Sequence, residues 1–292
     1  MLNTTPEAQT LKRKRQFQKR LENFGVYTIL VLVAILSIYP FLWTLRTSFS
    51  TSGGIFEFPP SLIPTDPSFK NFLTVTEIVP ILRQALNSLI ICFFGVVGAI
   101  IVAALGAYPL AKMKFWGRDA IFYALIATLV LPNEAGLIVN FITVSRLGLL
   151  ATDIGQYAAV ILPAFGSVAN VFLMRQAYLG IPTELLEAAR IDGASELRIW
   201  WSIMLPLTMP TIAAVSILQF VAFWNSFLWA FIVMRDRNLY PLSAGMLDLS
   251  GAFATNTRAV SAGAVIMMIP ILIVFLFFQR YFMRGLEGAV KG

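Results

Sequence analysis

The feature that most constrains this chain is a run of 21 residues, Gly25 to Leu45, that contains no charged side chain. A helix rises about 1.5 Å per residue, so a helix of this length crosses the ~30 Å hydrocarbon core of a bilayer. A cleaved signal peptide is the alternative. Its apolar core is shorter, about 7–15 residues, and ends at a small-residue cleavage site that this run lacks. The run is therefore predicted to be a transmembrane helix.

Five further apolar segments follow, at about 87–110, 119–142, 155–174, 211–234 and 261–278. The letters LPNE, Leu131 to Glu134, interrupt the second of these. The chain is 58% hydrophobic and 13% charged, whereas a soluble domain is about 45–50% apolar and about 25% charged. The sequence thus predicts an all-α integral membrane protein with about six transmembrane helices in one bundle, residues 25–292, after a basic arm at 1–24.

The basic residues predict which ends of the spans face the cytoplasm. With six spans, both termini lie on one side of the membrane. The arm, the turn at 112–118, the segment 175–206 and the tail hold 15 of the 22 Lys and Arg residues. Cytoplasmic loops are enriched in Lys and Arg, so both termini are predicted to be cytoplasmic and the loop at 235–260 external. Because these charges are spread over many loops, the net charge of +7 does not indicate nucleic-acid binding.

The residue types present argue against an enzyme, which stays open as a minor alternative. The chain has no histidine and a single cysteine, Cys92, inside an apolar run. This excludes histidine-dependent zinc sites, Ser-His catalysis and an internal disulfide. No paired acids lie at helical spacing inside a predicted span, and no metal or cofactor is expected.

A polar, helix-forming stretch joins the fourth and fifth predicted spans. It reads EAARIDGASELRIWWSIMLPLTMP, from Glu187 to Pro210. Thr183 is a candidate N-cap just before it, and Glu184 and Glu187 fall in the predicted first turn, where negative charge suits the helix dipole. Gly193 is a candidate for the positive φ that often ends a helix.

A second short helix is predicted after this glycine. Ser195 is its candidate N-cap, while Pro206 and Pro210 limit it and set the turn into the fifth span. Four residues fall along one side of the first helix, namely Leu185, Ala188, Ala189 and Asp192. The two small alanines on that side let another surface approach closely. Local physics leaves two interpretations open, a loop that shields the bundle or a docking surface.

The same stretch resembles the EAA loop of ABC-importer permeases, in which E-A-A is followed by three residues, G, nine residues and I-x-L-P. The matching residues are Glu187, Ala188, Ala189, Gly193, Ile203, Leu205 and Pro206. Other runs are similar to the carbohydrate branch of that family, in particular its second maltose-type permease: LNSLIICF, GAYPLAKMKFWGR, LRQAYLGIPTELLEAARIDGAS, FWNSFLWAFIV and FFQRYFMRGLEGAVKG.

The resemblance implies a type I ABC-importer permease fold in a prokaryotic plasma membrane. It implies that the EAA loop, about 182–206, docks into an ATPase subunit through Glu187, Ala188, Ala189, Asp192, Gly193, Ile203, Leu205 and Pro206. Implied partners are a second permease, an ATPase dimer and an extracytoplasmic solute-binding protein, reached by the loop at 235–260. The tail, 284–292, is expected between the ATPase subunits. Because this chain lacks a G-x-x-x-x-G-K-[ST] loop, ATP and Mg²⁺ are expected on the partner ATPase.

The implied function is sugar uptake by alternating access, with a di- or oligosaccharide, a polyol or a sugar phosphate as solute. Polar residues inside the predicted spans are candidates for the solute path, with Trp224 as a stacking surface: Asn133, Glu134, Asn140, Asn170, Gln219 and Asn225. In the maltose-type family, sugar contacts can come mainly from the other permease. Open alternatives are an ABC permease for peptides or amino acids and a secondary transporter, which would need ion-coupling groups of its own.

Overall fold

The computed structural model describes the chain except for residues 1–5, 53–62, 65, 250–255 and 291–292. Side chains are also outside the description at 6–17, 21, 133–134 and 280–290. Parts of the predicted arm, outer loop and tail therefore lie outside the described residues. Within the described residues the chain is helical, and β pairing is limited to one bridge between Ser50 and Pro67. The predicted all-α class is confirmed.

The chain divides into two compact units, which are described separately. The first comprises Met1–Leu73 and Thr257–Val265, and the second comprises Thr74–Asn256 and Ile266–Gly292. In the first unit, α1 (Pro6–Phe49) runs without a break through the predicted boundary between the arm and the first span. The end of α1 is held by Asn71, whose Nδ2 donates to the carbonyl oxygens of Ser48 and Ser50 at 2.9 Å each.

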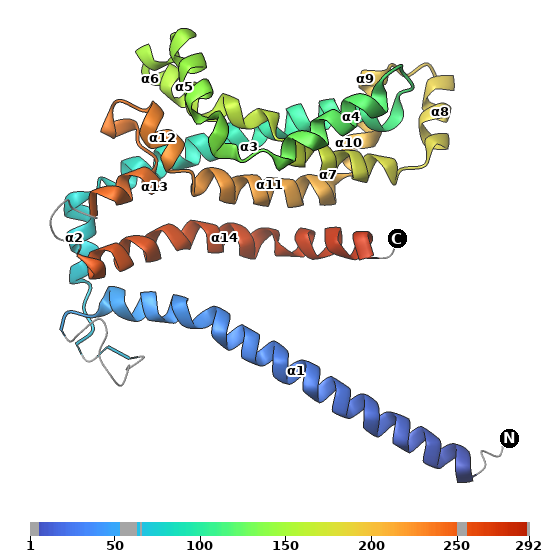
Figure 1. Ribbon diagram of the computed structural model, residues 1–292, viewed down its shortest axis with the longest axis horizontal. Coiled ribbons are helices and arrows are strands. Elements are labelled where there is room, and N and C mark those ends of the chain that lie inside the picture. Colours follow the sequence, from blue (N-terminus) through green and yellow to red (C-terminus); the bar gives the residue numbers. More distant parts are fainter. Residues whose placement is uncertain (1–5, 53–62, 65, 250–255, 291–292) are drawn as a thin grey trace. The chain divides into compact units, whose positions relative to one another are not determined.

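In the second unit, α3 (Ile81–Lys112) packs against both α7 (Val168–Leu179) and α11 (Met209–Trp224) (Figure 1). Small side chains on α3, namely Ala99, Ala103, Ala104 and Ala107, are fully buried. Small residues allow close helix approach, which is how helices pack where lipid provides no hydrophobic driving force.

The remaining elements of the second unit lie at the two ends of this packed core (Figure 1). One end carries α8 (Thr183–Ile191), α9 (Glu196–Ile199), η5 (Trp200–Met204) and α10 (Leu205–Leu207). The other end carries α5 (Leu137–Arg146), η3 (Leu149–Ala151), α6 (Asp153–Ile161), η4 (Leu162–Gly166), α12 (Leu228–Val233), η6 (Arg237–Leu239), α13 (Leu242–Gly245) and η7 (Met246–Leu249). The other elements are α2 (Lys70–Ile78), which precedes α3, and α4 (Arg118–Ala127), η1 (Thr128–Val130) and η2 (Asn133–Gly136), which follow it. The last helix is α14 (Thr257–Val290).

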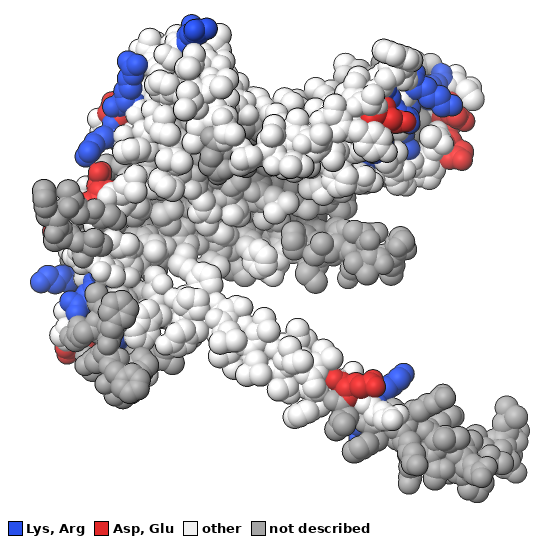
Figure 2. All heavy atoms as spheres, in the orientation of Figure 1, with Lys and Arg blue, Asp and Glu red and all other residues white. Residues whose placement is uncertain are grey.

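Charged side chains mark the two ends of the second unit. On the face shown in Figure 2, its Lys, Arg, Asp and Glu residues gather at these ends, and the band between them shows none. A band of uncharged surface is what a bilayer core requires.

Three described helices are long and apolar enough to cross a membrane: Gln18–Phe49, Ile81–Lys112 and Thr257–Gln279. Three of the predicted spans, at 25–45, 87–110 and 261–278, lie inside them. Two bent pairs, each apolar enough when taken together, would raise the count to five: Asp153–Gly166 with Val168–Leu179, bent by 48°, and Glu196–Leu207 with Met209–Trp224, bent by 78°. The count of six stays a prediction.

The predicted span at 119–142 is not one helix. It forms α4 and α5, each 10 residues long, which by rise is only about 15 Å. Pro132 explains the break, because proline lacks an N–H donor and disfavours helical backbone in the residue before it. Leu131 is accordingly extended, with φ −76° and ψ 130°.

The predicted fifth span, 211–234, is also wrong as a continuous helix, because α11 ends at Trp224. The side-chain amide of Asn225 donates to the carbonyl oxygen of Val221 at 3.0 Å, and the carbonyl oxygen of Ser226 accepts from Ser243 Oγ at 3.0 Å. Such side-chain hydrogen bonds give the backbone an alternative to a further helical turn.

Candidate functional site

The first candidate site is the loop between α7 and α11, here called the coupling loop (residues 182–208). Its first helix, α8, ends in a Schellman motif: Gly193 N donates to Arg190 O at 3.0 Å, and Ala194 N donates to Ala189 O at 2.9 Å. Gly193 has φ +78°, as its position in the sequence predicted. Thr183 is not the N-cap. It is the first helical residue, and Pro182, with φ −58° and ψ 137°, occupies the cap position.

The second helix of the coupling loop begins as predicted but ends later. Ser195 Oγ accepts from the backbone N–H of Arg198 at 3.4 Å and so caps α9. The helix then passes Pro206 and ends at Leu207, with Thr208 in the C-cap position. A π turn at Trp200–Met204 precedes the proline, and this wider turn provides a place in a helix where a missing N–H is tolerated.

The predicted docking residues of this loop separate into two sets. Five are exposed: Glu187, Ala188, Asp192, Gly193 and Pro206. The other three, Ala189, Ile203 and Leu205, are partly buried and pack against the cluster that joins α3, α7 and the loop. The exposed set forms a surface, and the second set supports it from behind.

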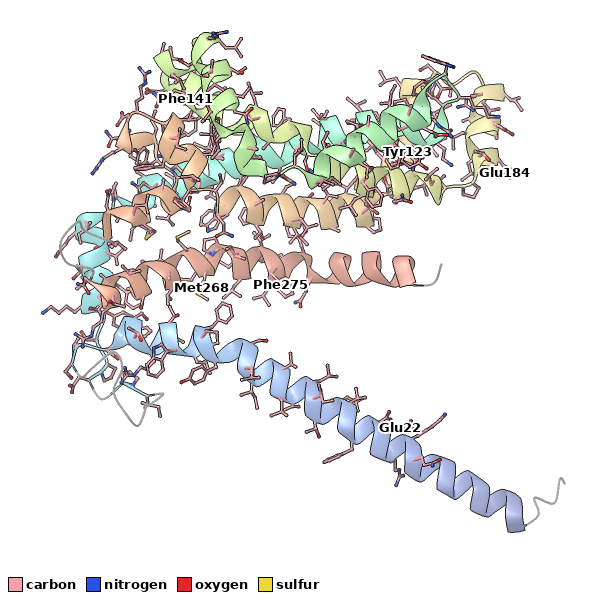
Figure 3. The ribbon with its side chains drawn as sticks, viewed as in Figure 1. Glu22, Tyr123, Phe141, Glu184, Met268 and Phe275 are labelled. Atoms are coloured by element: carbon pink, nitrogen blue, oxygen red, sulfur yellow. The ribbon has the colours of Figure 1, made fainter. Side chains whose placement is uncertain are left out.

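The most exposed large apolar side chains on this loop were not proposed as docking residues from the sequence: Ile191, which is 87% exposed, Leu197 and Trp201. Several large apolar side chains exposed on one segment are a common sign of a protein–protein contact. Glu184 lies on the same helix at this end of the unit (Figure 3).

The coupling loop is attached to the C-terminal half of α3 by polar contacts. Tyr108 Oη donates to the carboxylate of Glu196, which also accepts from Arg190 Nε at 2.7 Å. The hydrogen bonds from Arg190 and Tyr108 lower the pKa of the Glu196 carboxyl, which favours its charged form, and the bond to Glu196 raises the pKa of the Arg190 guanidinium. Trp200 Nε1 is within hydrogen-bond distance of Ala104 O, at 3.3 Å. These bonds connect the coupling loop directly to α3.

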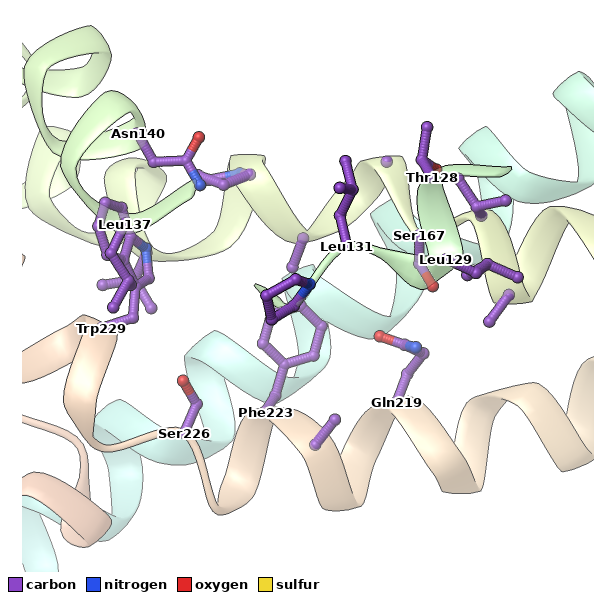
Figure 4. Close-up of a pocket in the computed structure, with 18 of the residues that line it drawn as sticks. Thr128, Leu129, Leu131, Leu137, Asn140, Ser167, Gln219, Phe223, Ser226 and Trp229 are labelled. Carbon is purple, nitrogen blue, oxygen red and sulfur yellow. The ribbon is translucent and has the colours of Figure 1, made fainter. Parts of the chain in front are cut away.

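The second candidate site is a cleft of about 900 Å³. Its walls come from η1 and the turn after it, from α5, from η4 and the start of α7, from the second half of α11, and from α12. Figure 4 shows Gln219 and Phe223 rising from α11 toward Ser167 and Leu131, while Asn140 and Trp229 lie at one side.

Two predicted path residues, Asn140 and Gln219, line this cleft. Asn170 is only 3% exposed and lies behind the wall, where its Oδ1 accepts from Gln219 Nε2 at 3.1 Å. Asn133 and Glu134 lie in η2, directly after the lining residue Pro132, but their side chains are outside the described part of the chain.

Trp224 and Asn225 do not line the cleft, so their predicted roles there are not supported. Trp224 is 1% exposed, stacks on Phe220 and donates to Met267 O at 3.0 Å. The aromatic residues that do line the cleft are Phe223 and Trp229. Trp229 lies in the same FWNSFLW run as Trp224, five residues further on, and follows the break at 225–227.

Comparison with known proteins identifies a family for most of this chain. Residues 95–288 match the family described as the binding-protein-dependent transport system inner membrane component. The chain is 37% identical over 264 residues to the arabinooligosaccharides transport system permease protein AraQ of Halalkalibacterium halodurans, covering 89% of this chain and 93% of that protein. It is 31% identical to the sn-glycerol-3-phosphate transport system permease protein UgpE of Yersinia pestis, covering 91% and 96% of the two chains.

A solved structure agrees with these sequence relatives. It is a chain of a bacterial ABC transporter involved in the import of the acidic polysaccharide alginate, with a TM-score of 0.73 and 28% identity. The match covers 91% of this chain and 98% of the other.

Proposed function

The chain belongs to the binding-protein-dependent transport system inner membrane components, and from this premise we propose that it is a permease subunit of an ATP-driven carbohydrate importer. The named transport systems of its relatives handle arabinooligosaccharides and sn-glycerol 3-phosphate, and that of its structural neighbour handles alginate. All three solutes are carbohydrates or a polyol phosphate, which favours this solute class over peptides and amino acids.

The observation that carries the proposal is the construction of the coupling loop. A rigid turn at Gly193 presents Glu187, Ala188 and Asp192 outward, and the loop is hydrogen-bonded to α3 through Tyr108 and Glu196. The chain has no phosphate-binding loop. We infer that the exposed surface of the coupling loop is gripped by a cytoplasmic ATPase, which binds the ATP and Mg²⁺ and moves the loop as a unit.

The cleft supplies the second part of the proposal. The cleft is lined by residues before, within and after the helix breaks at 128–136 and 225–227. Irregular backbone at membrane depth is tolerated where it lines a cavity. We infer that the cleft is this subunit's share of the translocation path, opened to either side in turn. A second permease would complete the path, and an extracytoplasmic binding protein would deliver the solute to the outer face.

Uptake by the assembled transporter tests the proposal. The permease is purified with the ATPase, the second permease and the binding protein encoded beside it, and is reconstituted into liposomes. Uptake of a labelled carbohydrate is expected to require ATP and the binding protein and to be lost in a Gly193→Val complex. Uptake that runs on an ion gradient without ATP would instead identify a secondary transporter and overturn the proposal.

A further inference from the structure

The relatives leave open whether the solute carries a charge, because arabinooligosaccharides are neutral whereas glycerol 3-phosphate and alginate are anionic. The cleft bears directly on this question. Among the described residues that line it there is no Asp, Glu, Lys or Arg. Its polar side chains are all uncharged: Thr128, Asn140, Ser167, Gln219 and Ser226.

The nearest cation along α7 is Arg175, and it does not line the cleft. Its Nε donates to Leu110 O at 3.1 Å, and its guanidinium carbon lies 3.8 Å from the centroid of the Phe122 ring. An anionic solute in this cleft would therefore meet no positive side chain among the described residues that line it. Burying an unpaired charge at membrane depth is strongly unfavourable.

The amides of the cleft wall are suited to hydroxyl groups. Gln219 Nε2 already donates to Asn170 Oδ1, which leaves Gln219 Oε1 as an acceptor. Asn140, the other amide side chain that lines the cleft, offers both a donor and an acceptor. A hydroxyl group both donates and accepts, so it can satisfy either kind of amide atom, whereas a carboxylate or phosphate dianion only accepts.

The aromatic residues of the wall suit the other surface of a sugar ring. Phe223 and Trp229 both line the cleft, and Trp229 is held by a hydrogen bond from its Nε1 to Ala159 O at 3.1 Å. An indole ring held in this way offers a flat apolar face to the C–H groups of a sugar. The combination of fixed aromatic faces and neutral amides characterises a site for an uncharged, hydroxylated ring.

We propose that the cleft formed by Gln219, Asn140, Ser167 and Trp229 selects uncharged, hydroxyl-rich carbohydrates and disfavours sugar phosphates and uronates. This proposal rests on the proposed function, since it concerns the solute of the same transporter. The cleft then selects solutes by their charge within the membrane, in addition to any selection by the binding protein.

Protection of a cysteine in the cleft tests the proposal. Ser226→Cys is introduced with Cys92→Ala, and the complete transporter is placed in lipid nanodiscs without its binding protein, so that only the cleft selects. The rate of alkylation at position 226 is measured with galactotriose and with trigalacturonate, which differ only in the carboxylates at C6. Arabinotriose and glycerol 3-phosphate serve as a further neutral probe and a further anionic probe, although they also differ in size. The neutral sugars are expected to slow alkylation at least about threefold at millimolar concentration, and the anions are not.

Variants of α11 then show whether Gln219 is responsible. Gln219→Ala is expected to raise the half-protecting concentration of the neutral sugar about tenfold, as for loss of a buried hydrogen bond. Ser216→Ala is the matched control, because Ser216 lies on the same helix but lines a separate apolar groove, and it should change nothing. Gln219→Arg should add protection by trigalacturonate.

The outcomes separate this proposal from the proposed function. Equal or stronger protection by the anions overturns the charge selection, and so does the absence of protection by any sugar in a transporter that takes up sugar. Absence of ATP-dependent uptake for every carbohydrate, neutral or anionic, would instead overturn the proposed function itself.

Discussion

At the scale of single residues, the shape of the coupling loop depends on Gly193. Its φ of +78° is strained for a β-branched residue, and no atom lies within 4 Å of the position that a Cβ would occupy, so a substitution acts through the backbone alone. Gly193→Val is expected to destabilise the turn by about 1–3 kcal/mol and to abolish co-purification of the ATPase. Gly193→Asn is the control, because Asn tolerates the left-handed region. Loss of the ATPase in both variants alike would contradict the backbone explanation.

Glu187 tests the surface of the loop rather than its backbone. The side chain is exposed and lies in the second turn of α8, not in the first turn as the sequence analysis placed it, so it contributes little to capping or to the helix dipole. Glu187→Lys is therefore expected to leave thermal unfolding of the purified permease unchanged while it reduces ATPase-coupled uptake severalfold. A lowered unfolding temperature with normal uptake would show that Glu187 stabilises the loop and is not a contact.

Residue roles were predictable where they depend on local chemistry and not where they depend on tertiary packing. Gly193 and Ser195 follow from helix-end chemistry within a few residues, and both stand as predicted. The choice between Trp224 and Trp229 depends on which helix ends where, and only the folded chain shows that Trp224 is buried against Met267.

At the scale of elements, the link between α3 and the coupling loop is a hydrogen-bonded chain. Tyr108→Phe removes the bond to Glu196 and leaves the ring packed against Tyr178. The expected loss of stability is about 0.5–1.5 kcal/mol, the usual contribution of one hydrogen bond. If the loop moves α3 through this bond, ATP hydrolysis should persist while uptake per ATP falls. An unchanged ratio of uptake to hydrolysis would show that apolar packing alone transmits the motion.

The coupling free energy of the Arg190–Glu196 ion pair can be measured separately with a double-mutant cycle on Arg190→Ala and Glu196→Ala. Both side chains are about 40% exposed, at 39% and 41%, so their coupling free energy is expected to be only about 0.2–1 kcal/mol. Chemical denaturation of the detergent-solubilised permease measures it, and a coupling energy several times larger would mean that Tyr108 and the pair act as one network.

Helix existence was predictable at this scale, but helix continuity was not. Apolar composition predicted helices at 119–142, 155–174 and 211–234, because a helix in a bilayer core needs apolar side chains. Each of these ranges does contain helix. The breaks at Pro132 and at Asn225 are set by single residues inside windows that remain apolar on average. The cleft lies at those breaks. A hydropathy average over a whole window does not detect them, so it misses the feature most relevant to transport.

At the scale of the whole molecule, α3 connects two polar loops, the segment 235–242 near its first turns and the coupling loop near its last residue. At its first turns, Arg83 Nε donates to Asn238 O at 3.1 Å and Asn87 Nδ2 to Tyr240 O at 3.0 Å, which attaches the segment 235–242. At its last residue, Lys112 Nζ donates to Ile181 O, at the start of the coupling loop. From Arg83 to Lys112 the helix rises about 44 Å, which is close to the ~40–45 Å thickness of a bilayer with its headgroups. The two loops are therefore expected to lie on opposite faces of the membrane.

Cysteine accessibility tests this arrangement and its orientation together. Arg198 and Arg235 are exposed, one on each loop, and each is replaced by Cys in a Cys92→Ala background. Because the segment with Arg198 belongs to the side rich in Lys and Arg, it is expected to be cytoplasmic. In intact spheroplasts a membrane-impermeant maleimide should label position 235, and position 198 should react only after permeabilisation. Labelling of both positions from outside would show that α3 does not cross the bilayer, and labelling of 198 alone would invert the topology and place the coupling loop where no ATPase can reach it.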